Sequence, residues 1–166
     1  MSQTTLDIKE PGLNVLPPGV ERHVVNAGGL TGLQIFPDDE IEIINEEGNQ
    51  ICEIICFDKD GKSELGILNQ KENCKKSFIK ELLKGKDEAS LITNLQLKKR
   101  NLDINKSKSS ILFDEQTPSG EKIKIKSKDK CYVIFAAPQN DMLVSEQNPS
   151  SDLTLFIKRY KITNDK

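Results

Sequence analysis

Apolar residues in this 166-residue chain recur mainly at every second position, which is the period of a half-buried β-strand. Such runs predict strands at 20–25, 30–36, 40–44, 50–57, 110–114, 121–127, 131–137 and 153–162. In 121–127 the alternation is strict, with Ile123 and Ile125 on one face and lysines on the other. The run 131–137 is almost wholly apolar, which predicts a central strand.

The runs 40–44 and 50–57 lie close together in the chain and are separated by the polar segment 45–49, which contains Gly48. Two β-type runs joined by a short turn with a glycine are typical of a hairpin. We therefore expect these two strands to pair with each other.

Between residues 74 and 101 the apolar period changes from two to about 3.6, which predicts helices. The first helix has the apolar stripe Phe78, Ile79, Leu82 and Leu83. Gly85 is a suitable stop for it, and a second helix is expected to begin near Asp87. The apolar face continues in this second helix through Leu91, Ile92 and Leu95.

Strands outnumber helices and occur near both ends of the chain. We therefore predict a mainly β (α+β) fold, a β-sandwich or a partly open barrel with a two-helix insertion at about 74–101. The length fits one β-rich domain over 1–166.

The net charge of −2 hides an asymmetry, because the segment 98–130 is basic and residues 1–60 are acidic. In 121–130 the lysines alternate with isoleucines, as expected for the wet face of a sheet, and aromatic residues are not interleaved with the charges. We therefore expect no nucleic-acid partner. No apolar run is long enough to span a membrane, and no signal peptide is recognisable, so we expect a cytoplasmic protein.

Four cysteines, Cys52, Cys56, Cys74 and Cys131, occur without a CxxC motif. Cys52 and Cys56 are four residues apart on one strand, so they face the same side at a separation of roughly 13 Å. That separation is too large for a shared metal ion or a disulfide. We expect reduced thiols packed in the core, with no metal and no cofactor.

Glu53 is the one carboxylate within the apolar run 50–57, and a buried charge needs a partner. With Asn49 and Gln50 it forms the best candidate polar cluster, and it is a weak candidate for a ligand or a general acid or base. The alternative is a structural acid that pairs with backbone amides or a lysine. Asp141 adds a candidate ligand-binding side chain in the loop 138–149.

His23, the single histidine, could act as a base or could simply face solvent on its strand. The segment 28–32 lacks the spacing of a phosphate-binding loop and does not precede a helix. The segment 58–64 has its glycine two positions too early for a calcium loop, so a turn is expected there.

Several segments resemble a known family. The segment 48–57 resembles the G-x-Q-x-x-D/E-x-x-x-F strand of urea carboxylase-associated domains. Such domains also occur in large aminomethyltransferase-like proteins related to the glycine cleavage T-protein, ahead of a folate-binding module. A shorter related domain leads those proteins, and this chain is similar to it in four segments: 16–23, 117–120, 136–138 and 152–159.

Catalytic members of the wider family resemble metal-dependent hydrolases of carboxylated amidines and have a cysteine before a Pro-Gln pair. Here Ala137 precedes Pro138 and Gln139, which weighs against metal binding and hydrolysis. The chain is also too short to contain the folate-binding module.

The resemblance implies a non-catalytic accessory or small-ligand-binding domain associated with folate-dependent one-carbon metabolism. Its expected partner is a folate-binding aminomethyltransferase domain, in the same chain or in another, and self-association stays open. Two alternatives remain: a hydrolase of a carboxylated amidine that uses Glu53, and an unrelated β module that binds a small molecule near Glu53 and the loop 141–147.

Overall fold

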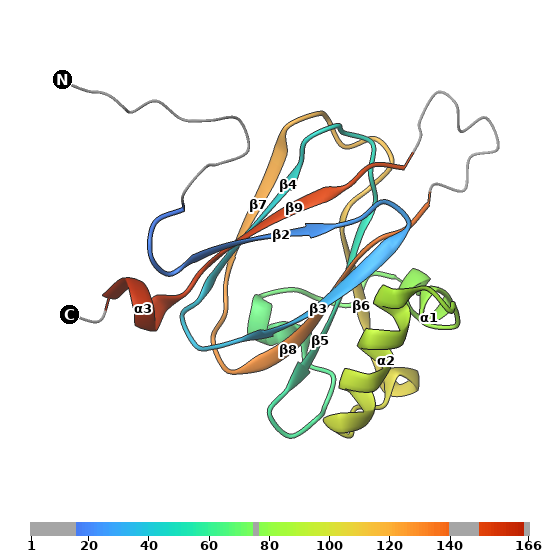
Figure 1. Ribbon diagram of the computed structural model, residues 1–166, viewed down its shortest axis with the longest axis horizontal. Helices are drawn as coiled ribbons and strands as arrows, with labels where there is room; N and C mark the ends of the chain where they lie inside the picture. Colours follow the sequence, from blue (N-terminus) through green and yellow to red (C-terminus); the bar gives the residue numbers. More distant parts are fainter. Residues whose placement is uncertain (1–15, 75–76, 140–149, 165–166) are drawn as a thin grey trace.

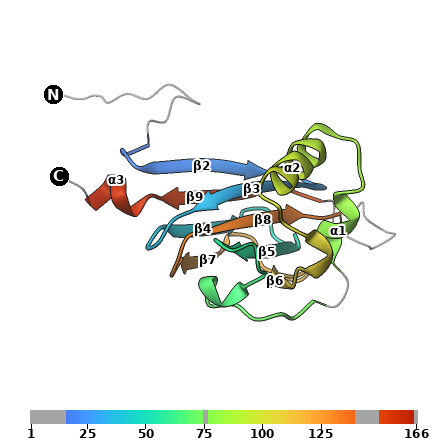
Figure 2. The ribbon, with the colours of Figure 1, turned by 90° about the horizontal axis from the view of Figure 1, so that it is seen from below.

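The computed structural model describes residues 16–74, 77–139 and 150–164. The elements in chain order are β2 (Val20–Val25), β3 (Gly29–Ile35), β4 (Glu40–Asn45), β5 (Cys52–Asp58), η1 (Leu65–Leu68), α1 (Phe78–Leu82), α2 (Glu88–Lys99), η2 (Ile104–Lys106), β6 (Ser109–Phe113), β7 (Glu121–Lys126), β8 (Cys131–Ala137), β9 (Leu153–Lys158) and α3 (Tyr160–Asn164). The strands form two antiparallel four-stranded sheets, in the orders β2-β9-β4-β7 and β3-β8-β5-β6 (Figures 1 and 2). The predicted mainly β fold is confirmed, and its form is a β-sandwich.

The main core lies between the two sheets and is built from alternate positions of their strands. Its fully buried members include Ile41, Ile43, Cys52, Ile54, Cys56, Val133, Phe135, Leu153, Leu155 and Ile157. Burying each of the larger aliphatic and aromatic side chains stabilises the fold by about 1.5–3 kcal/mol. The two-residue period of the sequence therefore marks the faces that meet in this core.

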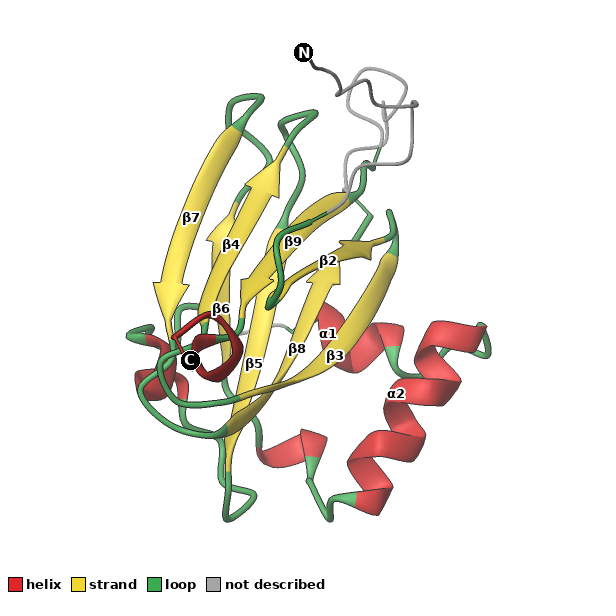
Figure 3. Cartoon of the chain, turned by 60° about the vertical axis from the view of Figure 1, so that its left-hand side comes forward, coloured by secondary structure: helices red, strands yellow, loops and turns green. Residues whose placement is uncertain are grey.

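A second apolar cluster lies on the outer face of the β3-β8-β5-β6 sheet, where α1 and α2 cover it (Figures 2 and 3). Ile79 of α1 and Leu97 of α2 pack there against Ile55 and Ile134. β8 therefore has apolar neighbours on both faces, and all seven of its residues are buried. The prediction of a central strand at 131–137 is confirmed, since β8 lies between β3 and β5.

Both helices of the predicted insertion are present, and α2 begins after Asp87 as expected. The Asp87 carboxylate accepts the Ser90 backbone N–H (3.2 Å) and so caps α2. The apolar face assigned to α2, however, does not continue the buried stripe of α1. It points outward, because Ser90, Thr93 and Leu97 are the buried residues of α2. No helix in the described part of the chain is long and apolar enough to cross a membrane.

The predicted hairpin of 40–44 and 50–57 is wrong. β4 pairs with β7 and β9, whereas β5 pairs with β6 and β8, so the two strands belong to opposite sheets. The connection between them crosses from sheet to sheet, with positive φ at Gly48 and Asn49 and a buried hydrogen bond from Asn45 Nδ2 to Gln50 O (2.8 Å). Pairing of distant strands prevails because it lets both runs turn an apolar face into the same core.

The predicted strand 153–162 is also partly wrong, since β9 ends at Lys158 and α3 follows. A network of polar side chains determines where β9 ends. The Arg159 guanidinium donates to the buried Asp39 carboxylate (2.8 Å), to both carboxylate oxygens of Glu21 (3.0 and 3.1 Å) and to Gln34 O (2.8 Å). Asp39 also accepts the Tyr160 backbone N–H (2.9 Å), which turns the chain out of the sheet.

Candidate functional site

Glu53 is fully buried on β5, next to the N-terminus of α1. Its Oε1 atom accepts the backbone N–H groups of Phe78 (2.7 Å) and Ile79 (3.1 Å), and its Oε2 atom accepts the Ser77 hydroxyl (2.6 Å). The first amides of a helix have no partner within the helix, and a carboxylate satisfies them well. Of the roles that the sequence left open, pairing with backbone amides is the one these contacts fit.

The other members of the predicted cluster do not join Glu53. Gln50 is fully buried and ties three segments together: its Nε2 atom donates to Ile51 O (2.9 Å) and Pro138 O (2.7 Å), and its Oε1 atom accepts the Ser151 N–H (2.8 Å). Asn49 is exposed and has a left-handed backbone conformation (φ 60°). Asp141 and the loop 141–147 lie outside the described residues.

Cys52, Cys56 and Cys131 are buried in the sandwich core, and Cys74 is half-buried. Burial raises the pKa of Cys52 well above its ordinary value, and the neighbouring Glu53 charge adds to the effect. A hydrogen bond to Cys131, together with burial, raises the pKa of Cys56 in the same direction. Cys52 and Cys56 are therefore suited to packing rather than to nucleophilic chemistry. Within 16–74, 77–139 and 150–164, no three His, Cys, Asp or Glu side chains are grouped so that they could hold a metal ion.

His23 lies half-buried on β2, with Nε2 3.0 Å from Glu21 Oε1. Glu21 also binds Arg159, and these contacts, the Arg159 hydrogen bond foremost, lower the pKa of Glu21. His23 therefore belongs to the network at the end of β9 and not to a separate site.

A concavity of about 410 Å³, which sequence reasoning did not find, opens where β5 and β8 meet the C-terminal end of α2. Charges of both signs line it, including Asp58, Arg100 and Lys130. One wall is the turn predicted at 58–64, in which Asp58 Oδ1 accepts the backbone N–H groups of Asp60 and Lys62 (both 2.9 Å). We call this concavity the α2–β8 pocket.

Arg100 closes one side of the α2–β8 pocket. Its guanidinium carbon lies 4.7 Å from the centroid of the Tyr132 ring, within the range of a cation–π contact. Its Nη1 atom donates to Gln34 Oε1 (3.2 Å), and Gln34 Nε2 donates in turn to Cys131 O (2.7 Å). The exposed Arg100 side chain thus joins the end of α2 to β3 and β8.

The Tyr132 hydroxyl is buried and has no hydrogen-bond partner within the part of the chain that the structure describes. It lies over Gly32, where a Cβ atom would be 2.0 Å from it. Burial raises the pKa of Tyr132, and the Arg100 charge opposes that shift. The sequence does hold a signal for this side chain, because Tyr132 lies inside the apolar run 131–137 and a buried phenol usually needs a hydrogen-bond partner.

No family model matches the chain, and no solved structure matches it. The trimethylamine-oxide aldolase of Ruegeria pomeroyi is 33% identical to the chain over 152 residues, which is 92% of this chain. The same match covers 19% of the aldolase, so the chain spans about a fifth of the length of that relative.

Proposed function

We propose that this chain is an accessory domain of an enzyme of the trimethylamine-oxide aldolase type, and that it supports a catalytic portion located elsewhere in that enzyme. The observation that carries the proposal is the extent of the match: 92% of this chain corresponds to 19% of the relative. A segment of that size fits one domain of a much larger enzyme.

The chemistry of such an enzyme fits the one-carbon metabolism that the family resemblance implies. Trimethylamine oxide contains carbon only in its methyl groups, so an aldehyde released from it by an aldolase has one carbon. A folate-binding aminomethyltransferase domain, the partner expected from the resemblance, handles carbon units of this size. This shared one-carbon chemistry is the reason for proposing a partner of that class.

The contacts of Glu53 fit a structural role of this side chain better than a catalytic role in hydrolysis. Both of its carboxylate oxygens already accept hydrogen bonds from the start of α1, at distances between 2.6 and 3.1 Å. A general base must reach a proton of the substrate, and a buried carboxylate that caps a helix is poorly placed for that. The hydrolase alternative, which depended on Glu53, is accordingly not preferred.

A second candidate function is the binding of a small polar ligand in the α2–β8 pocket. The volume of about 410 Å³ lies in the usual range for small-molecule sites, and Arg100, Lys130 and Tyr132 are among the residues that line it. Thermal unfolding with trimethylamine oxide, dimethylamine and formate at millimolar concentration tests this candidate. A rise in Tm that the Arg100→Ala variant abolishes would support it, and no rise with any of the three would refute it for this class of ligand.

A chimeric enzyme tests the accessory function. The segment of the Ruegeria pomeroyi aldolase that matches this chain would be replaced by this chain, and a second variant would lack the segment. We expect the chimera to release aldehyde from trimethylamine oxide faster than the deletion variant, and the isolated chain to release none. A folded, monodisperse chimera no faster than the deletion variant, or turnover by the isolated chain, would overturn the proposal.

A further inference from the structure

α2 has three large aliphatic side chains on its outer face. Leu91, Ile92 and Leu95 are 52%, 51% and 65% exposed, and their spacing of i, i+1 and i+4 groups them on one side of the helix. Single exposed aliphatic residues are normal on a protein surface, whereas contiguous exposed apolar patches can mark an interaction site. We call these three residues the α2 face.

Polar contacts on the opposite side of the helix fix this orientation. Ser90 Oγ donates to Leu82 O (2.8 Å), and Asn94 Nδ2 donates to Leu83 O (2.8 Å), so two hydrogen bonds join α2 to the end of α1. The Thr93 hydroxyl, also buried, donates to Ala89 O (2.8 Å) within the helix. Turning the helix to bury the α2 face would break both bonds to α1.

The C-terminal end of α2 is fixed as well. Leu97 is buried in the cluster beneath the helices, and Arg100 lies over the Tyr132 ring and donates to Gln34. Contacts at both ends of α2 therefore fix one rotation of the helix about its axis. The exposure of the α2 face is therefore built into the fold.

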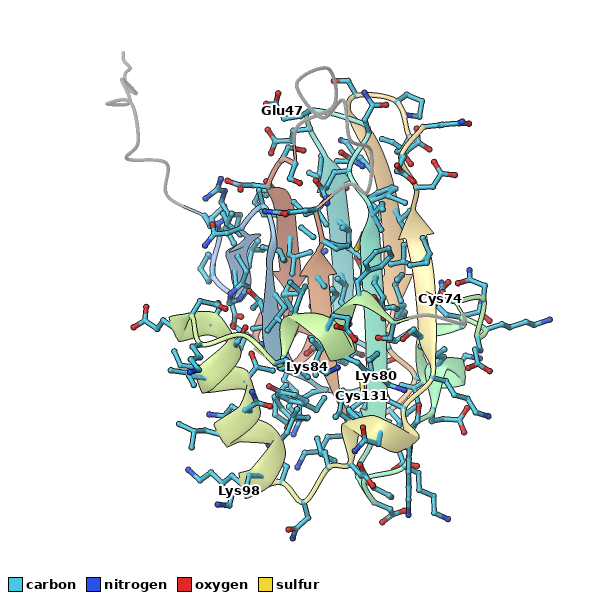
Figure 4. All side chains as sticks on the ribbon, turned by 90° about the vertical axis from the view of Figure 1, so that its right-hand side faces the viewer. Glu47, Cys74, Lys80, Lys84, Lys98 and Cys131 are labelled. Atoms are coloured by element: carbon cyan, nitrogen blue, oxygen red, sulfur yellow. The ribbon has the colours of Figure 1, made fainter. Side chains whose placement is uncertain are left out.

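Exposed lysines lie before the start and at the end of α2, and the exposed Glu88 lies in its first turn. Lys84 and Lys86 lie in the connection from α1, and Lys98 and Lys99 lie in the last turn of α2; all four are exposed. Figure 4 shows Lys84 near α1 and Lys98 near the far end of α2. A complementary partner surface would be apolar at its centre and acidic where it faces Lys98 and Lys99.

We propose that the α2 face docks on the remainder of the aldolase-type enzyme, the portion outside the segment that matches this chain; this inference rests on the proposed function. The size of the face argues for that occupant. A stable contact between separate molecules needs about 20–30 residues on each side, far more than this face supplies. A domain linked to its partner benefits from a high effective concentration, so a small apolar contact suffices.

The length of the aldolase, compared with that of this chain, is consistent with docking on the remainder of such an enzyme. Because the match covers 19% of the aldolase, the aldolase has a large remainder that could cover the face. Helix α2 also lies on the opposite side of the molecule from α3 (Figure 1), and α3 contains Ile162, another strongly exposed aliphatic residue (57%). Ile162 therefore offers a matched control far from the proposed contact.

Hydrogen exchange in the chimeric enzyme tests the docking. We expect amides of 88–99 to exchange at least about tenfold more slowly in the chimera than in the isolated chain. The triple variant Leu91→Gln, Ile92→Gln, Leu95→Gln should remove that protection and keep the helix, because glutamine is a good helix former. The Ile162→Gln control should leave the protection unchanged.

The outcomes separate the two proposals. An active chimera in which 88–99 exchanges as fast as in the isolated chain overturns the docking and leaves the accessory function standing. An inactive chimera without protection overturns both. Concentration-dependent protection of 88–99 in the isolated chain, lost in the triple variant, would assign the face to a second copy of this chain and would also overturn the docking.

Discussion

Replacing Glu53 with alanine would remove the carboxylate that caps α1. In the structure this side chain is fully buried and accepts the N–H groups of Phe78 and Ile79 and the hydroxyl of Ser77. The Ser77 hydroxyl in turn accepts the Lys80 N–H (3.2 Å), so the first turn of α1 depends on a short chain of hydrogen bonds that ends at Glu53.

The expected loss in the free energy of unfolding follows from these contacts. A hydrogen bond to a charged group contributes about 1.5–3 kcal/mol, and the contributions of neighbouring bonds do not add fully. Alanine also leaves buried N–H groups without an acceptor and opens a cavity beside Ile79. We therefore expect the free energy of unfolding to fall by about 3–5 kcal/mol, a large part of the 5–15 kcal/mol typical of a domain.

Urea unfolding followed by circular dichroism measures this change, with two-state behaviour checked by a second probe. Glu53→Gln is the matched control, because it keeps the volume and one acceptor oxygen, and it should lose only about 1–2 kcal/mol. A loss below about 1 kcal/mol for Glu53→Ala, with an unchanged m value, would refute the capping role.

Four other sites give further predictions. Arg159→Ala leaves the buried Asp39 without its guanidinium and should cost about 3–5 kcal/mol in urea unfolding; a loss below 1 kcal/mol would show the pair to be dispensable. Because Arg159 lowers the pKa of Glu21, the stabilisation by Glu21 is present above its ordinary pKa of 4.5 and is lost as the pH falls through the lowered value. The half-exposed Glu21 makes this effect small, and Glu21→Gln should flatten the acid limb of the stability profile; an identical limb would contradict it. Tyr132→Phe removes a buried hydroxyl that has no hydrogen-bond partner among the described residues, and it should leave stability unchanged or raise it by up to about 1 kcal/mol, whereas a loss of 1 kcal/mol or more would reveal an unrecognised partner. In a thiol titration of the native protein, half-buried Cys74 should react first and the buried thiols only on unfolding, so a Cys74→Ser protein with a fast thiol would contradict the assigned burial.

The strands were predictable where alternation is set by one buried face, as in β4 and β7, and where a run is buried on both faces, as in β8. The partners of the strands were not predictable from the same signal. The period of apolar residues says which side of a strand is buried but not which strand lies beside it, so β4 and β5, close in sequence, were paired wrongly.

The helices show the same limit. Capping at Asp87 and the change of period located α2, but the helix buries Ser90 and Thr93 and exposes the α2 face. Hydrogen bonds from Ser90 and Asn94 to carbonyl groups of α1 decide that rotation, and such contacts between elements leave no mark on a hydrophobic pattern.

The need of Glu53 for a partner was readable from its apolar neighbours, but the identity of that partner was not. The capped amides come from residues 78 and 79, some 25 positions away in the sequence. The α2–β8 pocket was missed for a related reason, because its walls come from β3, β5, β8 and the end of α2 and meet only in the folded chain.

Under the proposed function, Glu53 supports the fold and catalysis takes place elsewhere in an aldolase-type enzyme. The most direct test is the kcat for trimethylamine oxide of the chimeric enzyme carrying Glu53→Gln, measured at a temperature where both proteins are fully folded. We predict a kcat within about twofold of the unsubstituted chimera, since a capping group does not touch the reacting atoms. A fall of about a hundredfold or more with the fold intact is the size expected for loss of a general acid or base, and would contradict the account.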